Sequence, residues 1–349
     1  MGKIKNFLKR KDIVFSAKRY GIDALGAMAQ GLFASLLIGT IIGTLGTQLN
    51  IDIFVKIGDF AKKVSGSAMA IAIAYALNAP PLVLFSMTTV GFAANEIGGA
   101  GGPLAVLFIA IIAAECGKAV SKETKVDIIV TPFVTIFIGT LLSILIAPYI
   151  GNAAQSFGNA IMWATNLQPF LMGIVVSVLV GIALTLPISS AAICAALSLT
   201  GLAGGAAVAG CCAQMVGFAV MSFRENKWGG LFAQGIGTSM LQMGNIVKNP
   251  KIWIPPILAS AITGPIATCI FRLEMNGPAI SSGMGTCGLV GQIGVYTGWV
   301  NDASKVITSF DWIGLVLISF VLPAILTYII SLPLRKIGWI GKNDLKLDV

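Results

Sequence analysis

The sequence predicts an all-α polytopic membrane protein with about ten transmembrane helices and re-entrant elements. The chain has 349 residues, of which 56% are hydrophobic and 11% are charged, whereas soluble domains are about 25% charged. Its apolar runs are continuous, and most are close to the roughly 20 residues that cross a bilayer. The ten-residue segments of alternating polarity that mark a β-barrel do not occur. Both observations favour a bundle of membrane helices.

The long apolar runs give the candidate membrane spans. These are residues 24–48, 64–79, 81–94, 103–120, 127–150, 168–186, 188–202, 204–222, 252–272, 278–298 and 311–333. The run 81–94 is too short to cross alone. Residues 151–166 and 229–246 mix polar and apolar side chains, and we expect re-entrant or surface helices there, because irregular backbone at membrane depth needs protein or water around it. The result is about ten crossings plus two re-entrant elements.

The formal net charge of +9 is concentrated at the two ends of the chain. The positive-inside rule therefore places both termini in the cytoplasm. We divide the chain into an N-terminal interfacial basic helix (1–22), a transmembrane domain (23–335) and a cytoplasmic tail (336–349). In such a protein the basic residues indicate topology and contact with the lipid bilayer. Nucleic acid is not an expected partner.

Cysteine and histidine usage excludes several kinds of chemistry. The six cysteines lie in or beside apolar segments, no CxxC motif occurs, and the chain has no histidine. A disulfide framework, a zinc site and a Cys/His nucleophile pair are therefore unsupported. Nucleotide-binding and hydrolase motifs are absent as well. We expect no catalytic residues, no metal and no cofactor in this chain.

The stretch GFAANEIGGAGGP, residues 91–103, holds one carboxylate among five glycines. A carboxylate at the bilayer centre costs roughly 2.5–3.5 kcal/mol, so one that persists usually faces a cavity, a partner or water. Glycines let the backbone turn and approach a ligand closely. Glu96, Asn95, Gly98 and Gly99 are therefore candidate binding residues for a polyhydroxylated solute. The alternative is a short surface loop with a solvated Glu96.

A second polar stretch, FRLEMNGPAISSGMGTCG, covers residues 271–288. Glu274 and Asn276 are candidates for a second half of the solute site. The competing interpretation is a helix–helix interface, because small residues let helices pack closely. Four amides in apolar surroundings either line a pathway or hold helices together: Gln214, Gln234, Gln242 and Asn245.

Two proline-containing stretches add three further candidates. TLPISSAAI (185–193) carries Ser189 and Ser190, and YALNAPPL (75–82) carries Asn78. Proline interrupts a helix and frees backbone carbonyls, which nearby serines and amides can satisfy. Both places are interpreted first as kinks and second as binding sites.

Three stretches together resemble a known family. NAPPLVLFS (78–86), SKETKVDIIVTP (121–132) and NPKIWIPPILASAITGPI (249–266) are similar to EIIC-type membrane subunits of the phosphoenolpyruvate-dependent sugar phosphotransferase system. The closer match is the branch labelled as a toxin regulator, similar to the perfringolysin O regulator. The resemblance implies a permease of the bacterial plasma membrane with two inverted five-helix repeats, re-entrant hairpins and usually a homodimer.

The family binds sugar through a glutamate and a histidine. The resemblance implies that either Glu96 or Glu274 corresponds to this glutamate, whereas no residue of this chain can fill the place of the histidine. The resemblance also implies EIIA and EIIB subunits on separate proteins, since their domains are not in this sequence.

We therefore expect a membrane permease subunit that translocates a sugar or related polar solute within a phosphotransferase system. Two alternatives stay open. One is a membrane sensor or regulator of gene expression that kept the fold, which the missing histidine favours. The other is a proton- or ion-coupled carrier in which Glu96 or Glu115 titrates.

Overall fold

The computed structural model describes residues 2–347, and the regular secondary structure of the described part is helical, apart from one isolated antiparallel bridge between Gly201 and Met275. The all-α prediction is confirmed. The chain divides into two compact units, one ending at Ala153 and one beginning at Ala154. This division falls inside α8 (Asp127–Thr165).

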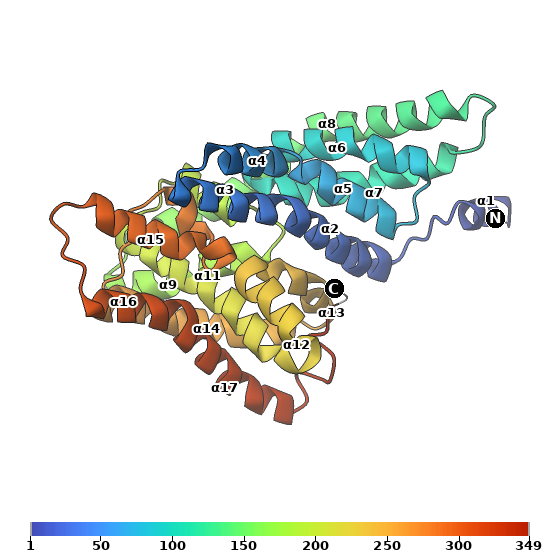
Figure 1. The fold of residues 1–349 in the computed structure, drawn as a ribbon. Coiled ribbons are helices and arrows are strands. Elements are labelled where there is room, and N and C mark those ends of the chain that lie inside the picture. The colour runs from blue at the N-terminus through green and yellow to red at the C-terminus, as the bar shows by residue number, and fades with distance from the viewer. Residues whose placement is uncertain (1, 348–349) are drawn as a thin grey trace. The chain divides into compact units, whose positions relative to one another are not determined.

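The first unit is built from helices that precede and include the start of α8 (Figure 1). They are α1 (Gly2–Arg10), α2 (Ala24–Leu32), α3 (Ile38–Leu49), α4 (Asp52–Lys63), α5 (Ser65–Ala76), α6 (Pro81–Gly98) and α7 (Gly102–Val120), with π-helical turns η1 (Arg19–Asp23) and η2 (Phe33–Leu37) next to α2. Helix α5 packs against α2, α6 and α7, while α3 packs against α4.

The glycine stretch after Glu96 forms the turn of a helical hairpin. Gly99 has φ +50° and ψ −120°, a conformation that only glycine adopts readily. It stops α6, a short turn η3 (Gly99–Gly101) follows, and α7 returns along α6. The turn therefore explains why this stretch is rich in glycine.

The second unit contains the later helices of the chain. They are α9 (Pro169–Thr185), α10 (Ser190–Ala196), α11 (Gly201–Met221), α12 (Phe223–Phe232), α13 (Met243–Lys248), α14 (Ile254–Pro265), α15 (Val290–Asn301), α16 (Ser309–Val316) and α17 (Leu322–Lys336). Short turns connect them: η4 (Ala233–Gly237), η5 (Ser239–Gln242), η6 (Pro250–Trp253), η7 (Ile266–Ile270), η8 (Ala279–Gly283), η9 (Cys287–Leu289) and η10 (Leu317–Val321). Helix α11 is buried almost throughout, because α9, α14 and α17 pack around it (Figure 1).

Membrane spanning is supported by six described helical runs that are long and apolar enough to cross: Arg19–Leu49, Pro81–Val120, Asp127–Thr165, Gly201–Met221, Pro250–Ile270 and Ser309–Lys336. Two shorter apolar helices are Ser65–Ala76 and Pro169–Thr185. The polytopic membrane class is thus confirmed. The count of about ten crossings and the inverted-repeat arrangement stay predictions.

Two predicted spans are wrong. Residues 188–202 contain the short α10 and then a break before α11 begins at Gly201, and residues 278–298 contain η8 and η9 before α15 begins. The backbone leaves the helical region at Ser198 (φ 48°) and Leu289 (φ 59°). Apolar composition alone does not separate a spanning helix from an interrupted segment that neighbouring helices bury.

Residues 151–165 continue α8 as helix, and residues 229–246 form a series of short helices and helical turns. Whether these two segments are re-entrant or lie at the surface stays a prediction. In the N-terminal segment, α1 ends at Arg10 and residues 13–16 are not helical. Whether this segment lies in the membrane interface stays a prediction.

Candidate functional site

Two interrupted segments of the second unit, residues 186–201 and 271–289, are held together by serine hydroxyls. Ser190 Oγ donates a 2.7 Å hydrogen bond to the carbonyl of Gly283, and both groups are buried. In the opposite direction, Ser282 Oγ donates to the carbonyl of Leu199 at 2.6 Å. Carbonyls left free by the helix breaks are thereby satisfied, as buried backbone requires.

The second of these segments begins in an extended conformation. The backbones of Gly201 and Met275 exchange two hydrogen bonds of 2.9 and 3.0 Å. Side chains alternate along an extended backbone, so Leu273 and Met275 are buried while Glu274 is exposed. Gly205 permits this pairing, because a Cβ atom there would lie 1.7 Å from the carbonyl oxygen of Leu273.

The exposed side of the extended segment lines a pocket of about 440 Å³. Its polar walls include Glu274 and Asn276. Asn276 Nδ2 donates to Glu274 Oε2 at 3.1 Å, and Asn276 Oδ1 accepts from the backbone amide of Gly201, also at 3.1 Å. The amide group is therefore held in a fixed orientation, and it orients the carboxylate in turn.

Charged and aromatic side chains complete the pocket, namely Arg272, Asp302, Lys305, Asp311, Phe271, Trp299 and Phe310. Lys305 Nζ pairs with Asp311 Oδ1 at 2.7 Å. Hydrogen bonds from Ser304 lower the pKa of Asp302, so that carboxyl is ionised at neutral pH. In the described part of the chain, Arg272 makes no ion pair. Acceptors, donors and aromatic faces in one cavity can bind a polyhydroxylated solute, and the volume lies in the usual range for small-molecule sites.

The other two candidates of this unit have structural contacts. Ser189 is the N-cap of α10, and its Oγ accepts from the amide of Ala192 at 3.2 Å. Ser190 bonds to Gly283 as described above, and neither serine is among the residues lining the pocket. The structure therefore brings Glu274 and Asn276 into one pocket without Ser189 and Ser190.

The candidates of the first unit lie at the hairpin turn. Glu96 is exposed near the end of α6 and has no ion pair or hydrogen bond among the described residues, while Asn95 is half-buried. Gly98 is buried, and Gly99 is the exposed turn residue. Their role in solute binding stays a prediction.

Asn78 belongs to a different place. It follows α5 and lies before α6, whereas Glu96 lies near the other end of α6. At 1.5 Å per residue, the fifteen steps from Pro81 to Glu96 separate the two places by about 22 Å along the helix axis. Asn78 and Glu96 are therefore not parts of one small-molecule site.

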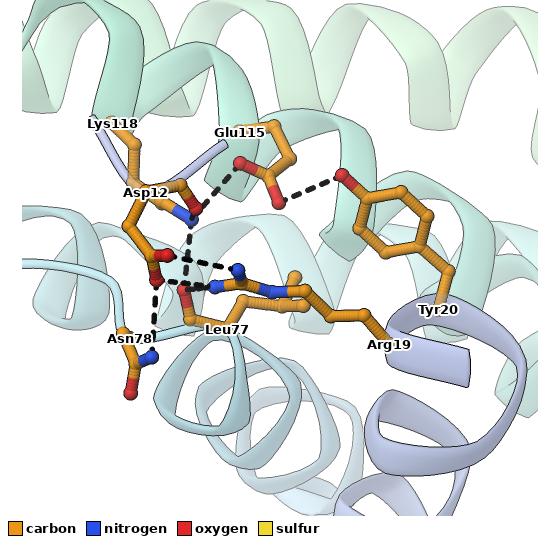
Figure 2. Close-up of polar contacts among 7 residues, drawn as sticks. All are labelled: Asp12, Arg19, Tyr20, Leu77, Asn78, Glu115 and Lys118. Carbon is orange, nitrogen blue, oxygen red and sulfur yellow. Dashed lines mark hydrogen bonds and ion pairs between the residues drawn. The ribbon is translucent and has the colours of Figure 1, made fainter. Parts of the chain in front are cut away.

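Asn78 instead joins a cluster of charges around the N-terminal segment (Figure 2). Asn78 Nδ2 donates to Asp12 Oδ2 at 3.1 Å. The Arg19 guanidinium donates to both Asp12 oxygens, at 3.1 and 2.6 Å, and to the carbonyl of Leu77 at 2.6 Å. The hydrogen bond from Arg19 is the main reason that the pKa of Asp12 lies at about 2. The stability that this depressed pKa provides is fully present above about pH 4 and is lost only as the pH falls toward 2.

The buried side of the same cluster contains Lys118, which is 2% exposed (Figure 2). Its Nζ donates to the carbonyls of Asp12 and Leu77 at 2.7 and 2.8 Å. Lys118 Nζ also lies 3.0 Å from Glu115 Oε2. The two groups form an ion pair, but their geometry is not that of a hydrogen bond. Tyr20 hydroxyl donates to the other Glu115 oxygen at 3.0 Å. The cluster fastens the N-terminal segment to the ends of α5 and α7.

Sequence reasoning missed the aromatic and charged walls of the 440 Å³ pocket. Trp299 and Asp302 lie more than twenty residues after Glu274, and no local pattern connects them. The usable signal was the polar run Asn301–Lys305 between two apolar helices. Among the described residues no group of three or more Cys, Asp or Glu side chains could hold a metal ion, and all six cysteines are free.

Comparison with known proteins assigns the family. The model of the family described as "Phosphotransferase system, EIIC" matches residues 22–347. No curated protein and no solved structure matches the chain. The family match covers nearly the whole chain and includes the helices of both units, the hairpin at Gly99 and the pocket around Glu274. This chain therefore belongs to the EIIC family of the phosphotransferase system, whose members are membrane permease subunits for sugars.

Proposed function

We propose that this chain translocates a sugar or a closely related polyol, and that the solute binds in the pocket of Glu274 and Asn276. The observation that carries the proposal is this pocket, in a chain that an EIIC family model matches from residue 22 to residue 347. The Glu274 carboxylate accepts hydrogen bonds from sugar hydroxyls, and its own bond from Asn276 fixes its position. Phe310, which lines the same pocket and is 52% exposed, offers an aromatic ring to the C–H groups of a sugar.

A ligand panel identifies the solute class. Purified protein in detergent is heated with sugars, polyols and organic acids in turn. A ligand at about 100 times its dissociation constant adds roughly 2.7 kcal/mol to the native state, which raises the unfolding temperature measurably. We expect a sugar or polyol to raise it, and stabilisation by organic acids alone would contradict the proposal.

Two carboxylate variants locate the site. Glu274→Gln removes the charge-assisted acceptor, which contributes about 1.5–3 kcal/mol in typical hydrogen bonds, so solute affinity should fall at least about tenfold. Glu96→Gln is the matched control, because both side chains are exposed and both variants should fold. Normal binding by Glu274→Gln with loss in Glu96→Gln would move the site to the hairpin turn. Normal binding by both would remove both carboxylates from solute recognition.

The coupling partners follow from the family. We expect separate EIIA and EIIB proteins to supply the phosphoryl group, so uptake into vesicles should require both proteins and phosphoenolpyruvate. The chain itself has no histidine, and this favours a sensor or regulator as the second candidate. Solute binding with no phosphoenolpyruvate-dependent uptake would support that candidate, whereas uptake driven by a pH gradient alone would support an ion-coupled carrier. A homodimer is expected, and the mass of the protein in detergent measures it.

A further inference from the structure

The second unit carries two adjoining cavities that no part of the proposed transport reaction uses. One has a volume of about 380 Å³ and a mainly apolar lining that includes Val220, Leu231 and Leu332. The other has a volume of about 560 Å³ and a polar lining. Arg224 and Arg335 line both cavities. The two cavities therefore adjoin at these two arginines, and we call the pair the amphipathic groove, with an apolar and a polar end.

The polar end of this groove is strongly cationic. Its lining contains four cations against one carboxylate: Arg224, Arg335, Lys342 and Lys346 with Glu225. Arg335 is already engaged, because it donates to Glu225 at 2.8 Å and to the carbonyl of Met221 at 3.0 Å. Arg224, Lys342 and Lys346 are exposed, and their side chains have no ion pair among the described residues. Three cations are thus available for an anionic group.

The two lysines are held in place by the chain itself. Asn226 Nδ2 donates to the carbonyl of Leu345 at 2.7 Å, and Asn226 Oδ1 accepts from the amide of Leu347 at 2.8 Å. Asn245 Nδ2 donates to the carbonyl of Lys346 at 2.8 Å. Near Lys342, the amide of Gly341 and Asn249 Nδ2 both donate to Asp344 Oδ2. The backbone that carries the two lysines is therefore fixed at the edge of the groove, so less conformational freedom is lost when an anion binds.

The groove lies where a membrane surface should be. Its apolar end is formed by the last turns of α11 and α17, and both helices belong to runs that are long enough to cross a bilayer. Exposed aromatic side chains stand nearby on α12, with Trp228 65% and Phe232 58% exposed. Aromatic residues in this position are typical of the membrane–water interface. Basic residues there attract anionic lipid headgroups.

We propose that this groove binds an anionic glycerophospholipid. The headgroup phosphate lies among Arg224, Lys342 and Lys346, and an acyl chain lies along Leu231 and Leu332. Charge complementarity accounts for the first contact, and the position of the apolar cavity directly beside the cationic one, with Arg224 and Arg335 lining both, accounts for the second. The site is independent of the solute pocket, so it stands or falls separately from the proposed transport function.

Native mass spectrometry of the full-length protein tests the proposal. The probes are dioleoyl phosphatidylglycerol, which is anionic, and dioleoyl phosphatidylcholine, which is neutral overall. We expect the parent protein to retain phosphatidylglycerol at least tenfold more strongly. The triple variant Arg224→Gln/Lys342→Gln/Lys346→Gln should lose at least tenfold in retention, because each basic residue near the surface contributes several-fold. Equal retention of the two lipids by the parent would overturn the proposal.

A matched triple variant controls for charge. Lys56→Gln/Lys63→Gln/Lys125→Gln removes three exposed cations elsewhere and gives the same net charge. We expect it to retain phosphatidylglycerol like the parent, and an equal loss in both triples would show non-specific attraction and overturn the site. Soluble glycerophosphoglycerol and inorganic phosphate serve as competitors. If either displaces the lipid at equal concentration, the groove recognises phosphate without an acyl chain and the lipid assignment fails.

Discussion

Lys118 is a buried cation whose partners come from three separate parts of the chain. Its ammonium contacts the carbonyls of Asp12 and Leu77 and the carboxylate of Glu115 (Figure 2). A buried charge is tolerated when it is paired and hydrogen-bonded, and removal of one partner leaves the other uncompensated. Replacing only Lys118 or only Glu115 should therefore cost more folding stability than replacing both residues together.

This difference gives a prediction for the cluster. Lys118→Met should lower the free energy of unfolding by about 3 kcal/mol, because it leaves Glu115 buried without its cation. The double variant Lys118→Met/Glu115→Leu should lose less than the sum of the two single losses, with a coupling of about 1–3 kcal/mol. Thermal and denaturant unfolding in detergent measure both values. Lys122→Met is the control: Lys122 is exposed in the next loop, so this variant should unfold like the parent. Strictly additive losses in the Lys118 and Glu115 variants would mean that the pair is not coupled.

Sequence reasoning could see the ionisable residues but could not predict their partners. Glu115 and Lys118 are recognisable as charges at the end of an apolar run. Asp12 and Arg19 lie about a hundred residues earlier, in a segment predicted as interfacial helix. Pairing across such a distance depends on tertiary packing, and helical periodicity contains no information about it. Likewise, Glu274 and Asn276 were identifiable, but the pocket also depends on Trp299 in the last turn of α15 and on Asp302 directly after it.

The C-terminal tail is an element that the sequence indicates only as a charged end. In the structure Leu345 is fully buried, and its carbonyl accepts from Asn226 and also from Gln242 at 3.0 Å. The side-chain amide of Gln242 in turn donates to Gln234 Oε1 at 2.9 Å. Some of the amides that were predicted to line a pathway or to hold helices together therefore form a hydrogen-bond network that fastens the tail. The tail is thus docked on α12 and α13 through backbone-directed hydrogen bonds (Figure 1).

Docking of the tail leads to a graded prediction. Asn226→Ala removes both bonds to the tail, whereas Asn226→Asp keeps the acceptor for the amide of Leu347 and loses the donor to the carbonyl of Leu345. Trypsin should therefore cleave after Lys342 and Lys346 faster in Asn226→Ala than in Asn226→Asp, and slowest in the parent. Protection falls because local unfolding of the tail becomes easier. Equal cleavage rates in the three proteins would show that Asn226 does not hold the tail.

The regular helices were predicted well, and the interrupted segments were not. The predicted spans 204–222 and 252–272 compare with helical runs Gly201–Met221 and Pro250–Ile270, a difference of a few residues at each end. Long apolar runs must satisfy their backbone internally, so helix is the default. The segments 188–202 and 278–298 are also apolar, but serine hydroxyls and a neighbouring backbone satisfy their carbonyls instead. These hydrogen bonds form only when the two segments pack against each other, so the sequence of either segment alone does not predict them.

At the scale of the whole molecule, the basic residues and the long helices together predict which side each loop faces. Lys11 pairs with Glu123 at 2.5 Å, so the N-terminal segment and the loop after α7 lie on the same side of the first unit. The run Ser309–Lys336 is 28 residues long, or about 42 Å as a helix, and it separates the loop 302–308 from the tail. If the basic termini are cytoplasmic, the loop 302–308 faces the outside.

Thiol labelling in intact cells tests this orientation. Thr124→Cys and Ser304→Cys are placed separately in a Cys269→Ser background, because Cys269 is the exposed thiol among the described residues, and both new positions are exposed. A membrane-impermeant maleimide should label Ser304→Cys in intact cells and should label Thr124→Cys only after permeabilisation. The Cys269→Ser parent supplies the background signal. Labelling of Thr124→Cys alone in intact cells would invert the whole topology, whereas labelling of both would mean that the loop after α7 and the loop 302–308 face the same side. Either result would also remove the cytoplasmic placement on which access of EIIA and EIIB proteins to this permease depends.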